Sequence, residues 1–258
     1  MVSVFDRGFT YGDGLFETMR VVEGKPFRWD AHLERLNTGA DFLGIALPLS
    51  PEKLRVSADE LITENQLSNC VLRLMISRGV GTRGYSPRSA NSPTVVMTTH
   101  PAEPPPPSRR LMTSSHVLKS GDPLLRYKTC NKLMHVLARQ EAERAGFDEA
   151  LLVNDLGHPV SATSANLFWI VAETVCTCPV NSGALPGVTR AILRNLCAEA
   201  GIAYVEKPIA HNELTSAEGV FLTSSTAGIV PVSCLGAHAL GVPKLVQHLA
   251  AGYARLDY

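Results

Sequence analysis

The chain has 258 residues, of which 45% are hydrophobic and 19% charged, a balance typical of globular proteins. Lysine plus arginine equals aspartate plus glutamate at 24 each, so no net charge draws the chain to nucleic acid or to an anionic membrane. No stretch approaches the roughly 20 apolar residues of a membrane span, and MVSVFDRGFTYGDG lacks the pattern of a secretion signal. We therefore expect a cytoplasmic protein whose partner is a small molecule, not nucleic acid or membrane.

The first half of the chain predicts a mixture of strands and helices. LFETMRVVEGKPFRW predicts two strands around a turn at Glu23 and Gly24. The segments 30–45 and 50–67 predict amphipathic helices, the second capped by Ser50. Two further strands are expected in NCVLRLMISRG and SPTVVMTTH.

A proline-rich segment, HPAEPPPPSRR, follows these elements. Consecutive prolines favour a stiff polyproline II connector over a helix or an interior strand. We therefore predict a small α+β domain over 1–105 and a larger domain over 106–258, with the connector at about 101–110.

The second half alternates strands and helices irregularly. We expect a strand at 111–117, a helix at about 131–145, a hairpin made of FDEALLVND and NLFWIVAE, and a helix in PGVTRAILRNLCAEAG. A strand in AYVEKPI, a helix near 212–217, a strand in GVFLTSS and a C-terminal helix in PKLVQHLAAGYARL follow. This order is not the regular alternation of a doubly wound sheet, and no GxGxxG or GxxxxGK[ST] motif is present, which counts against nucleotide binding.

The six cysteines and eight histidines give no sign of a metal site. The cysteines fall mostly inside apolar runs, where buried free thiols are expected. The histidines lack ligand spacing such as HxxxH, so no metal is expected.

Two lysines, Lys128 and Lys132, stand four residues apart near the start of the predicted helix at 131–145. Lys132 falls inside this helix and is interpreted as a solvated charge. Lys128 precedes the helix, where the positive end of the helix dipole and burial would both lower its pKa. A neutral amine is what Schiff-base chemistry requires, so Lys128 is either an ordinary surface charge or a reactive group.

Two segments are suited to receive a phosphate. LPGVTRAIL offers a helix N-terminus at which Gly187 permits close approach and Val188 and Thr189 supply donors. TSSTAG offers a second donor-rich turn, with Ser225 and Thr226. Taken singly, each is a common structural device.

In combination, these segments resemble the class IV, fold type IV pyridoxal-phosphate enzymes, which comprise branched-chain aminotransferases, D-amino-acid aminotransferases and 4-amino-4-deoxychorismate lyases. The resemblance covers nearly the whole chain and rests on DRGFTYGDGLFETMRV, HLERL, SRGVGTRGYS, YKTCNKL, DEALLVN, SANLFWI, LPGVTR and VFLTSSTAGIVPV, all in family order. It implies an α+β fold with a small α+β domain and a larger barrel-like β domain flanked by helices. It also implies pyridoxal 5'-phosphate in the crevice between the domains, and a homodimer whose partner completes the substrate pocket.

The same resemblance implies site residues. Lys128 is the lysine implied to form the Schiff base and to act in catalysis, and Lys132 is not. Arg35 in HLERL is implied to contact the cofactor phosphate, whereas its position alone suggests an exposed helix arginine paired with an acidic residue. The implied cofactor-binding residues are Arg35, Lys128, Ser161, Val188, Thr189, Ser225 and Thr226.

Ser161 departs from the family pattern. The family usually has a glutamate five residues before the asparagine of NLFW, where it keeps the pyridine nitrogen of the cofactor protonated. A hydroxyl can only hydrogen-bond there, which predicts a weaker electron sink and disfavours transamination more than β-elimination. The serine is also compatible with a decayed site. The family usually carries a further strand before VSVFDRGF, so we expect a missing edge strand or a late start.

The substrate side favours the lyase branch of the family. SRGVGTRGYS resembles the lyase version and places Arg83 and Tyr85 where a substrate carboxylate would arrive, since an arginine fork binds a carboxylate in a bidentate way. The D-amino-acid enzymes have tyrosine at the position of Phe16 and histidine at that of Tyr85. Neither is present here, which counts against that branch. A flexible loop with solvated charges is the alternative interpretation of Arg78 and Arg83.

Asp13 and Glu17 raise the question of a pair of catalytic acids. No facing partner is evident for either residue. We therefore expect them to hydrogen-bond the turn in YGDG and to line a strand.

The leading hypothesis from the sequence is a lyase that converts 4-amino-4-deoxychorismate to 4-aminobenzoate, a folate precursor, and pyruvate. Lys128 would remove the proton from the amine-bearing carbon and then protonate the leaving group. The first alternative is a class IV aminotransferase acting on branched-chain or other small amino acids. The second is a catalytically decayed relative that serves as a binding or dimerisation module.

Overall fold

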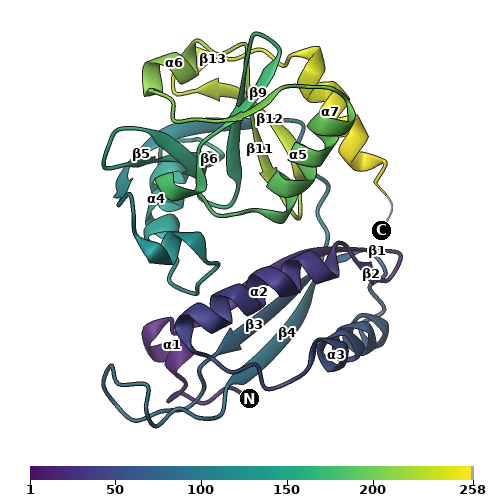
Figure 1. Cartoon of the computed structure of the whole chain (residues 1–258), viewed down its shortest axis with the longest axis vertical. Helices are drawn as coiled ribbons and strands as arrows, with labels where there is room; N and C mark the ends of the chain where they lie inside the picture. The colour runs from purple at the N-terminus through teal and green to yellow at the C-terminus, as the bar shows by residue number, and fades with distance from the viewer. Residues whose placement is uncertain (257–258) are drawn as a thin grey trace. The chain divides into compact units, whose positions relative to one another are not determined.

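The computed structural model describes residues 1–256 and separates them into two compact units (Figure 1). Each unit has its own sheet and its own apolar core. The predicted division into domains at residue 105 stays a prediction. Among the described residues, the first unit consists of Met1–Glu103 and Tyr127–Lys132, and the second of Pro104–Arg126 and residues 133–256.

The first unit contains a four-stranded antiparallel sheet with the order β2-β1-β3-β4. The turn between β1 and β2 is the predicted one, because Glu23 and Gly24 both have the positive φ angles, 50° and 79°, that a tight hairpin turn needs. The strands are β1 (Gly14–Val22), β2 (Lys25–Pro26), β3 (Cys70–Ser77) and β4 (Thr94–Pro101).

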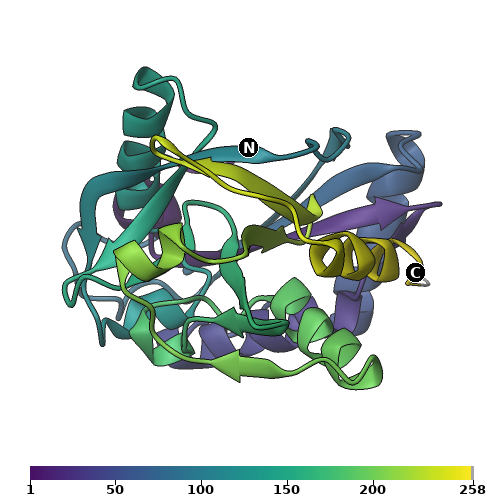
Figure 2. The same ribbon diagram turned by 90° about the horizontal axis from the view of Figure 1, so that it is seen from above.

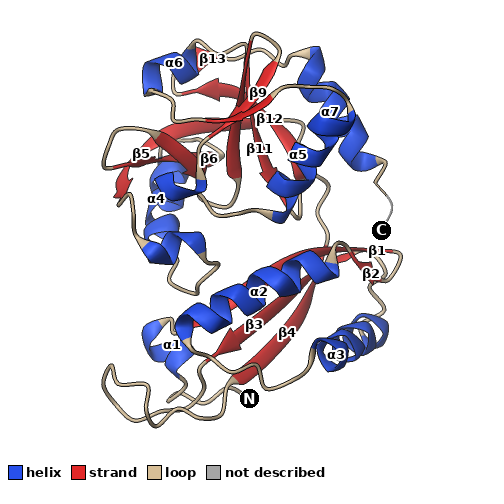
Figure 3. Cartoon of the chain, viewed as in Figure 1, coloured by secondary structure: helices blue, strands red, loops and turns tan. Residues whose placement is uncertain are grey.

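Three helices accompany this sheet: α1 (Arg7–Tyr11), α2 (Trp29–Leu43) and α3 (Pro51–Glu64). The predicted Ser50 cap of α3 is confirmed, since its hydroxyl accepts a hydrogen bond from the Lys53 amide at 3.4 Å. The apolar sides of α2 and α3 share one core with the sheet. A long loop without regular structure joins β3 to β4 and is tan in Figure 3.

The segment Tyr127–Lys132 lies along the start of β1 and forms a single β-bridge with it, between Thr129 and Leu15. The Phe16 amide donates to the Lys128 carbonyl at 2.9 Å, and the Cys130 amide donates to the Gly14 carbonyl at 2.8 Å. The following helix, α4 (Leu133–Arg144), begins only after this segment ends. The prediction that Lys132 lies inside the helix was therefore wrong.

The second unit is built around a closed ring of six strands. Each strand pairs with its neighbours in the order β8-β11-β12-β5-β6-β7, and β7 pairs back to β8 through Ser161 and Asn166. One hydrophobic cluster includes residues from all six strands and fills the barrel. The strands are β5 (Arg109–Leu118), β6 (Glu149–Asn154), β7 (Pro159–Ala162), β8 (Asn166–Val171), β11 (Gly219–Ser224) and β12 (Gly228–Leu235).

The hairpin predicted from FDEALLVND and NLFWIVAE was wrong, because β7 lies between those two strands. β6 pairs with β7, and β7 in turn pairs with β8. All four residues of β7 are buried, so this short strand shows no alternation of polar and apolar residues that would indicate it.

The remaining elements surround the barrel. α4 packs Ala138 and Ala142 against the outside of the barrel, and α5 (Val188–Glu199) packs against α7 (Lys244–Ala254), as Figure 2 shows from above. The smaller elements are β9 (Thr174–Thr177), β10 (Tyr204–Glu206), β13 (His238–Ala239), α6 (His211–Thr215) and the 3-10 turns Pro123–Arg126 and Val180–Ser182.

The predicted fold class is confirmed: the chain is α+β, with a small antiparallel sheet in one unit and a barrel flanked by helices in the other. Within residues 1–256, no helix is long and apolar enough to cross a membrane.

Candidate active site

Lys128 lies beside β1. It belongs to the segment Tyr127–Lys132, which comes from the middle of the chain and packs with the first unit. Its side chain is half-buried, and its Nζ atom stands 4.5 Å from the centroid of the Phe16 ring. The guanidinium carbon of Arg73, on the neighbouring strand β3, stands 4.1 Å from the same centroid. The structure thus brings the predicted residues Lys128 and Phe16 together and adds Arg73.

The pKa of the Lys128 amine is lowered, which favours its neutral form. This pKa is lowered from 10.5 to about 8, mainly by burial and next by the nearby Arg35 charge, although Glu17 opposes the change. The predicted direction is confirmed. The predicted helix dipole is not the cause, because α4 begins five residues later.

Glu17 organises the charges next to Lys128. Its carboxylate is 1% exposed and accepts hydrogen bonds from Arg35 Nε at 2.8 Å and Arg35 Nη2 at 2.6 Å. His32 Nδ1 lies 2.7 Å from the same carboxylate. The expectation that Glu17 bonds the turn was wrong, since its partners come from α2, fifteen and eighteen residues away.

The ionisation states in this network follow from its geometry. Burial by itself raises the pKa of Glu17, but the hydrogen bonds from Arg35 and His32 outweigh it and hold the pKa below its ordinary value. Burial lowers the pKa of His32, so this ring is neutral and donates from Nδ1 to the carboxylate. His32 Nε2 is then a buried acceptor, with no hydrogen-bond partner among the described residues.

The position of Arg35 alone suggested an exposed helix arginine paired with an acidic residue, and the pairing is present, with Glu17. The Arg35 side chain is nevertheless almost buried, with 11% exposed. The guanidinium is therefore held in a fixed orientation by Glu17, and its contact with the cofactor phosphate stays a prediction.

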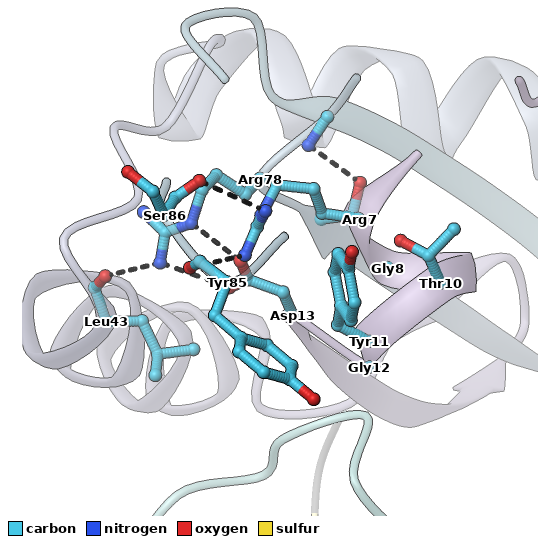
Figure 4. Close-up of polar contacts among 12 residues, drawn as sticks. Arg7, Gly8, Thr10, Tyr11, Gly12, Asp13, Leu43, Arg78, Tyr85 and Ser86 are labelled. Carbon is cyan, nitrogen blue, oxygen red and sulfur yellow. Dashed lines mark hydrogen bonds and ion pairs between the residues drawn. The ribbon is translucent and has the colours of Figure 1, made fainter. Parts of the chain in front are cut away.

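Arg83 and Tyr85 lie in the loop between β3 and β4. Arg83 is exposed, and the Tyr85 ring packs against Tyr11 with centroids 5.6 Å apart. This loop is fastened by a pair of arginines, Arg7 and Arg78, that share the carboxylate of Asp13 (Figure 4). The alternative interpretation of Arg78 as a solvated charge is therefore wrong, and so is the expectation that Asp13 bonds the turn.

In the second unit, the N-terminus of α5 is exceptionally tight. A Cβ atom on Gly187, the residue that caps this helix, would stand 2.1 Å from Asn166 Oδ1, so a larger residue would have to displace the Asn166 side chain. Thr189, in the first turn, is 2% exposed, and its Oγ1 atom has no hydrogen-bond partner among the described residues. The helix therefore presents amides and a buried hydroxyl together.

Three polar residues stand side by side on neighbouring strands next to this helix. Ser161 on β7 pairs with Asn166 on β8, and Asn166 pairs with Thr223 on β11. The Thr223 hydroxyl is also buried, without a partner among the described residues. Ser225 and Thr226 follow in the turn between β11 and β12, after the predicted apolar strand.

The predicted residues thus fall into three groups. Phe16, Arg35 and Lys128 gather in the first unit, and Arg83 and Tyr85 lie on its loop. The residues of the second unit are Ser161, Val188, Thr189, Ser225 and Thr226.

Sequence reasoning missed Arg73, Thr223 and the partners of Asp13. Arg73 had a signal, because it is a charged residue inside the apolar strand VLRLMIS and faces away from the core residues Leu72 and Leu74. The pairing of Asp13 with Arg78 had none, because it joins residues 65 positions apart.

Comparison with known proteins agrees with this architecture. The model of the family "Amino-transferase class IV" matches residues 14–235. The chain belongs to this family. A protein of Methanocaldococcus jannaschii, provisionally described as a branched-chain-amino-acid aminotransferase, is 37% identical over 90% of this chain and 81% of its own length. The D-alanine aminotransferase of Bacillus licheniformis is 33% identical over 93% and 85%.

Solved structures of the family superpose closely on this class IV enzyme. The crystal structure of 4-amino-4-deoxychorismate lyase from Pseudomonas aeruginosa gives a TM-score of 0.90 at 32% identity, covering 100% of this chain and 96% of that one. The branched-chain aminotransferase of the archaeon Thermoproteus uzoniensis, solved with norvaline, gives 0.93 at 25% identity, covering 99% and 89%.

Pyridoxal 5'-phosphate is the cofactor of this family, and the residues present fit it. A phosphate group needs backbone and hydroxyl donors at a helix N-terminus, and the buried Thr189 hydroxyl at the start of α5 is such a donor without a partner among the described residues. The cofactor aldehyde needs an amine that can be neutral, and a pKa of about 8 at Lys128 fits that requirement. The chain is thus a pyridoxal-phosphate-dependent enzyme of class IV.

Proposed function

We propose that this enzyme is a lyase that converts 4-amino-4-deoxychorismate to 4-aminobenzoate and pyruvate, a step toward folate. The observation that carries the proposal is Ser161, buried on β7 where the family usually has a glutamate. A hydroxyl does not hold a proton on the pyridine nitrogen as a carboxylate does. That favours an elimination, which needs the cofactor to accept electrons only briefly.

The bound cofactor supplies an aldehyde that holds the substrate amine and a ring that draws electrons from the adjacent carbon. Lys128 Nζ, neutral above a pH of about 8, takes the proton from the amine-bearing carbon. The same amine then gives that proton to the enolpyruvyl group as its carbon–oxygen bond to the ring breaks. Pyruvate leaves, the ring becomes aromatic, and no further reactant is needed.

The other residues of the site are proposed to bind and orient the cofactor. Arg35, fixed by Glu17, is proposed to bind the cofactor phosphate together with the Val188 and Thr189 amides. Ser225 and Thr226 are proposed to complete the phosphate contacts from the turn after β11.

On the substrate side, Arg83 and Tyr85 are proposed to receive the carboxylate, and Phe16 to pack against the substrate beside Lys128. Arg83 and Tyr85 are solvent-exposed in a single chain, which agrees with a pocket that a second copy completes.

The proposed homodimer has support from apolar side chains left at the surface. Leu133, Met134, Val136 and Leu137 of α4 are all exposed, although Ala138 on the same helix is buried. A surface of this kind is typical of an interface. Light scattering after size-exclusion chromatography should give about twice the monomer mass of 27.8 kDa, and a monomeric enzyme with full activity would contradict the proposal.

A second candidate function is an aminotransferase of branched-chain or other small amino acids. The 37% and 33% identities to proteins named as aminotransferases favour it. Such an enzyme would return the amino group to a 2-oxo acid and show ping-pong kinetics.

One experiment separates the two. The purified protein is loaded with pyridoxal 5'-phosphate, its visible absorbance is recorded, and enzymatically generated 4-amino-4-deoxychorismate is added while pyruvate is followed. Release of one pyruvate per substrate, with the visible band recovered afterwards, supports the lyase. A band that is lost on addition of an amino acid and restored by a 2-oxo acid, without pyruvate release from 4-amino-4-deoxychorismate, would transfer the protein to the aminotransferases.

A further inference from the structure

The loop between β3 and β4 is long, but it is tied to α1 by one buried side chain. Arg7 is only 4% exposed although it is charged. The backbone of α1 also meets the start of the loop, since the Arg7 amide donates to the Gly79 carbonyl at 2.9 Å and Asp6 forms a bridge with Val80.

The guanidinium of Arg7 binds three successive carbonyls of this loop (Figure 4). Nη1 donates to the carbonyls of Gly84 at 2.9 Å and Ser86 at 3.3 Å, and Nη2 donates to that of Tyr85 at 3.1 Å. The backbone therefore curves around the guanidinium, and the Tyr85 side chain lies outside, 87% exposed.

The charge of Arg7 is balanced inside the same cluster. Its Nε donates to Asp13 Oδ2 at 2.8 Å, and Arg78 donates to the same carboxylate from Nε at 2.8 Å and Nη2 at 3.1 Å. Arg78 is anchored in turn to the carbonyls at the end of α2, Leu43 at 2.7 Å and Gly44 at 2.9 Å. The loop is thus linked to two helices through one carboxylate.

Tyr11, at the other end of α1, adds a second attachment. Its hydroxyl accepts a hydrogen bond from the Gly84 amide at 2.9 Å, and the Arg7 guanidinium carbon stands 4.8 Å from its ring centroid. Both backbone groups of Gly84 are therefore engaged by α1. Gly84 itself has a φ of 109°, a conformation that favours glycine.

We propose that Arg7 is a positioning residue for substrate binding: its guanidinium holds residues 84–86 in the conformation that presents Arg83 and Tyr85 to a carboxylate. This inference rests on the proposed function in one respect, that Arg83 and Tyr85 contact the substrate. A lysine cannot replace Arg7, because an ammonium lacks the planar fork that reaches several carbonyls and a carboxylate at once.

The first test measures the loop directly and does not depend on activity. Trypsin can cut the loop after Arg83 and after Arg88, both exposed. In the cofactor-loaded enzyme, Arg7→Lys should raise the rate of cutting at these two sites about tenfold, as followed by mass spectrometry, because cleavage requires local opening of the loop. The control is Arg55→Lys, which changes a surface arginine of α3 paired with Asp59 and should leave the rate unchanged.

Tyr11→Phe is the second variant, in case Arg7→Lys does not fold. It removes only the acceptor of the Gly84 amide and should raise the cutting rate by a smaller factor, about threefold. Unchanged rates in the folded variants would overturn the inference that Arg7 and α1 hold the loop.

The second test separates positioning from a purely structural role. Arg7→Lys should raise KM about tenfold with kcat within about twofold and the visible band unchanged, as expected when only substrate binding is weakened. Arg83→Ala should do the same, and the double variant should be no worse than Arg83→Ala alone, because both act through one contact.

The outcomes are distinguishable. A faster cut with normal KM in Arg7→Lys, while Arg83→Ala raises KM, would overturn the positioning role. A normal KM in Arg83→Ala would overturn the proposed substrate contact and the positioning role with it, and the trypsin result would stand alone. If pyruvate release fails altogether, the same KM comparison is made with the amino acid that converts the cofactor.

Discussion

Buried polar groups are satisfied differently in two regions of the molecule, the charge network of the first unit and the polar residues beside α5 in the second. In the first, the buried charges are matched within the fold: Glu17 by Arg35 and His32, and Asp13 by Arg7 and Arg78. In the second, neutral hydroxyls are left over. Thr189 and Thr223 are each 2% exposed and have no hydrogen-bond partner among the described residues.

The physical reason is the difference between burying a charge and burying a dipole. An uncompensated buried charge costs several kcal/mol, so the fold must supply its partner before any ligand arrives. A buried hydroxyl without a partner costs about 1–3 kcal/mol, which a domain tolerates. The first unit therefore supplies partners for the charges of Glu17 and Asp13 by itself, whereas the second keeps two buried hydroxyls available to a ligand, and substitutions at these positions should differ accordingly.

The largest effect is expected at Lys128, the group in the first unit whose pKa is lowered toward neutrality. Lys128→Ala should remove the visible absorbance of the cofactor-loaded enzyme and lower turnover by at least about 10²–10⁴-fold, the usual contribution of a positioned acid–base group. Absorbance and product release are measured on the same sample.

Lys132→Ala is the matched control, since Lys132 lies in the same segment, Tyr127–Lys132, and is not implied in the chemistry. It should retain the band and most of the activity. A Lys128→Ala variant that keeps the band would refute the assignment.

The next effect tests whether the first unit depends on its own charge pairing. Glu17→Gln leaves Arg35 without its buried counter-charge and should lower the free energy of unfolding by about 3–5 kcal/mol in urea titrations. Asp59→Asn, which breaks the exposed pair with Arg55 on α3, should cost less than about 1 kcal/mol.

The same variant has a pH signature. The folded pKa of Glu17 lies below its unfolded value, so its contribution to stability is present above the unfolded pKa and is lost as the pH falls through the folded pKa. Wild-type stability should therefore fall on acidification below a pH of about 4 more steeply than that of Glu17→Gln. Parallel curves would show that Glu17 does not carry this dependence.

A third prediction concerns the protonation of Lys128. Because its pKa is lowered to about 8, the rate of cofactor uptake by cofactor-free protein should rise about tenfold per pH unit from pH 6 and level off above pH 8. Arg73→Gln should move the midpoint upward, since the charge of Arg73 disfavours the ammonium form. A rate that still climbs at pH 10 would mean an ordinary lysine.

The smallest effect is expected in the second unit. Thr189→Val keeps the shape and removes the unpartnered hydroxyl, so cofactor-free stability should be unchanged or slightly higher, while cofactor affinity falls about tenfold for one lost hydrogen bond. Fluorescence titration measures the affinity.

Thr177→Val is the contrasting control in the same unit. The Thr177 hydroxyl is buried but donates to the Leu167 carbonyl at 2.7 Å and accepts from Arg190 at 3.1 Å. Its loss should destabilise the cofactor-free protein by about 1–3 kcal/mol. Equal stability changes in Thr177→Val and Thr189→Val would remove the distinction between paired and reserved hydroxyls.

Local patterns in the sequence determined much of this protein. The periodicity of α2 and α3, the Ser50 cap and the Glu23–Gly24 turn are encoded within a few residues, and all were predicted correctly. The order of short motifs identified the family, and with it the α+β fold and the cofactor. These signals can be recognised without the tertiary structure because each depends on residues that are close together in the chain.

Only the tertiary structure decided how the buried charges are paired and where Lys128 lies relative to β1 and α4. A spacing of four residues placed Lys132 on a helix, whereas hydrogen bonds to β1 hold Lys128 and its neighbours in a segment that precedes the helix. The hydrogen bonds from the Arg7 guanidinium to the carbonyls of residues 84–86 join positions more than 75 residues apart. Such contacts depend on which surfaces the fold brings together, and burial then requires each charge to find its partner there.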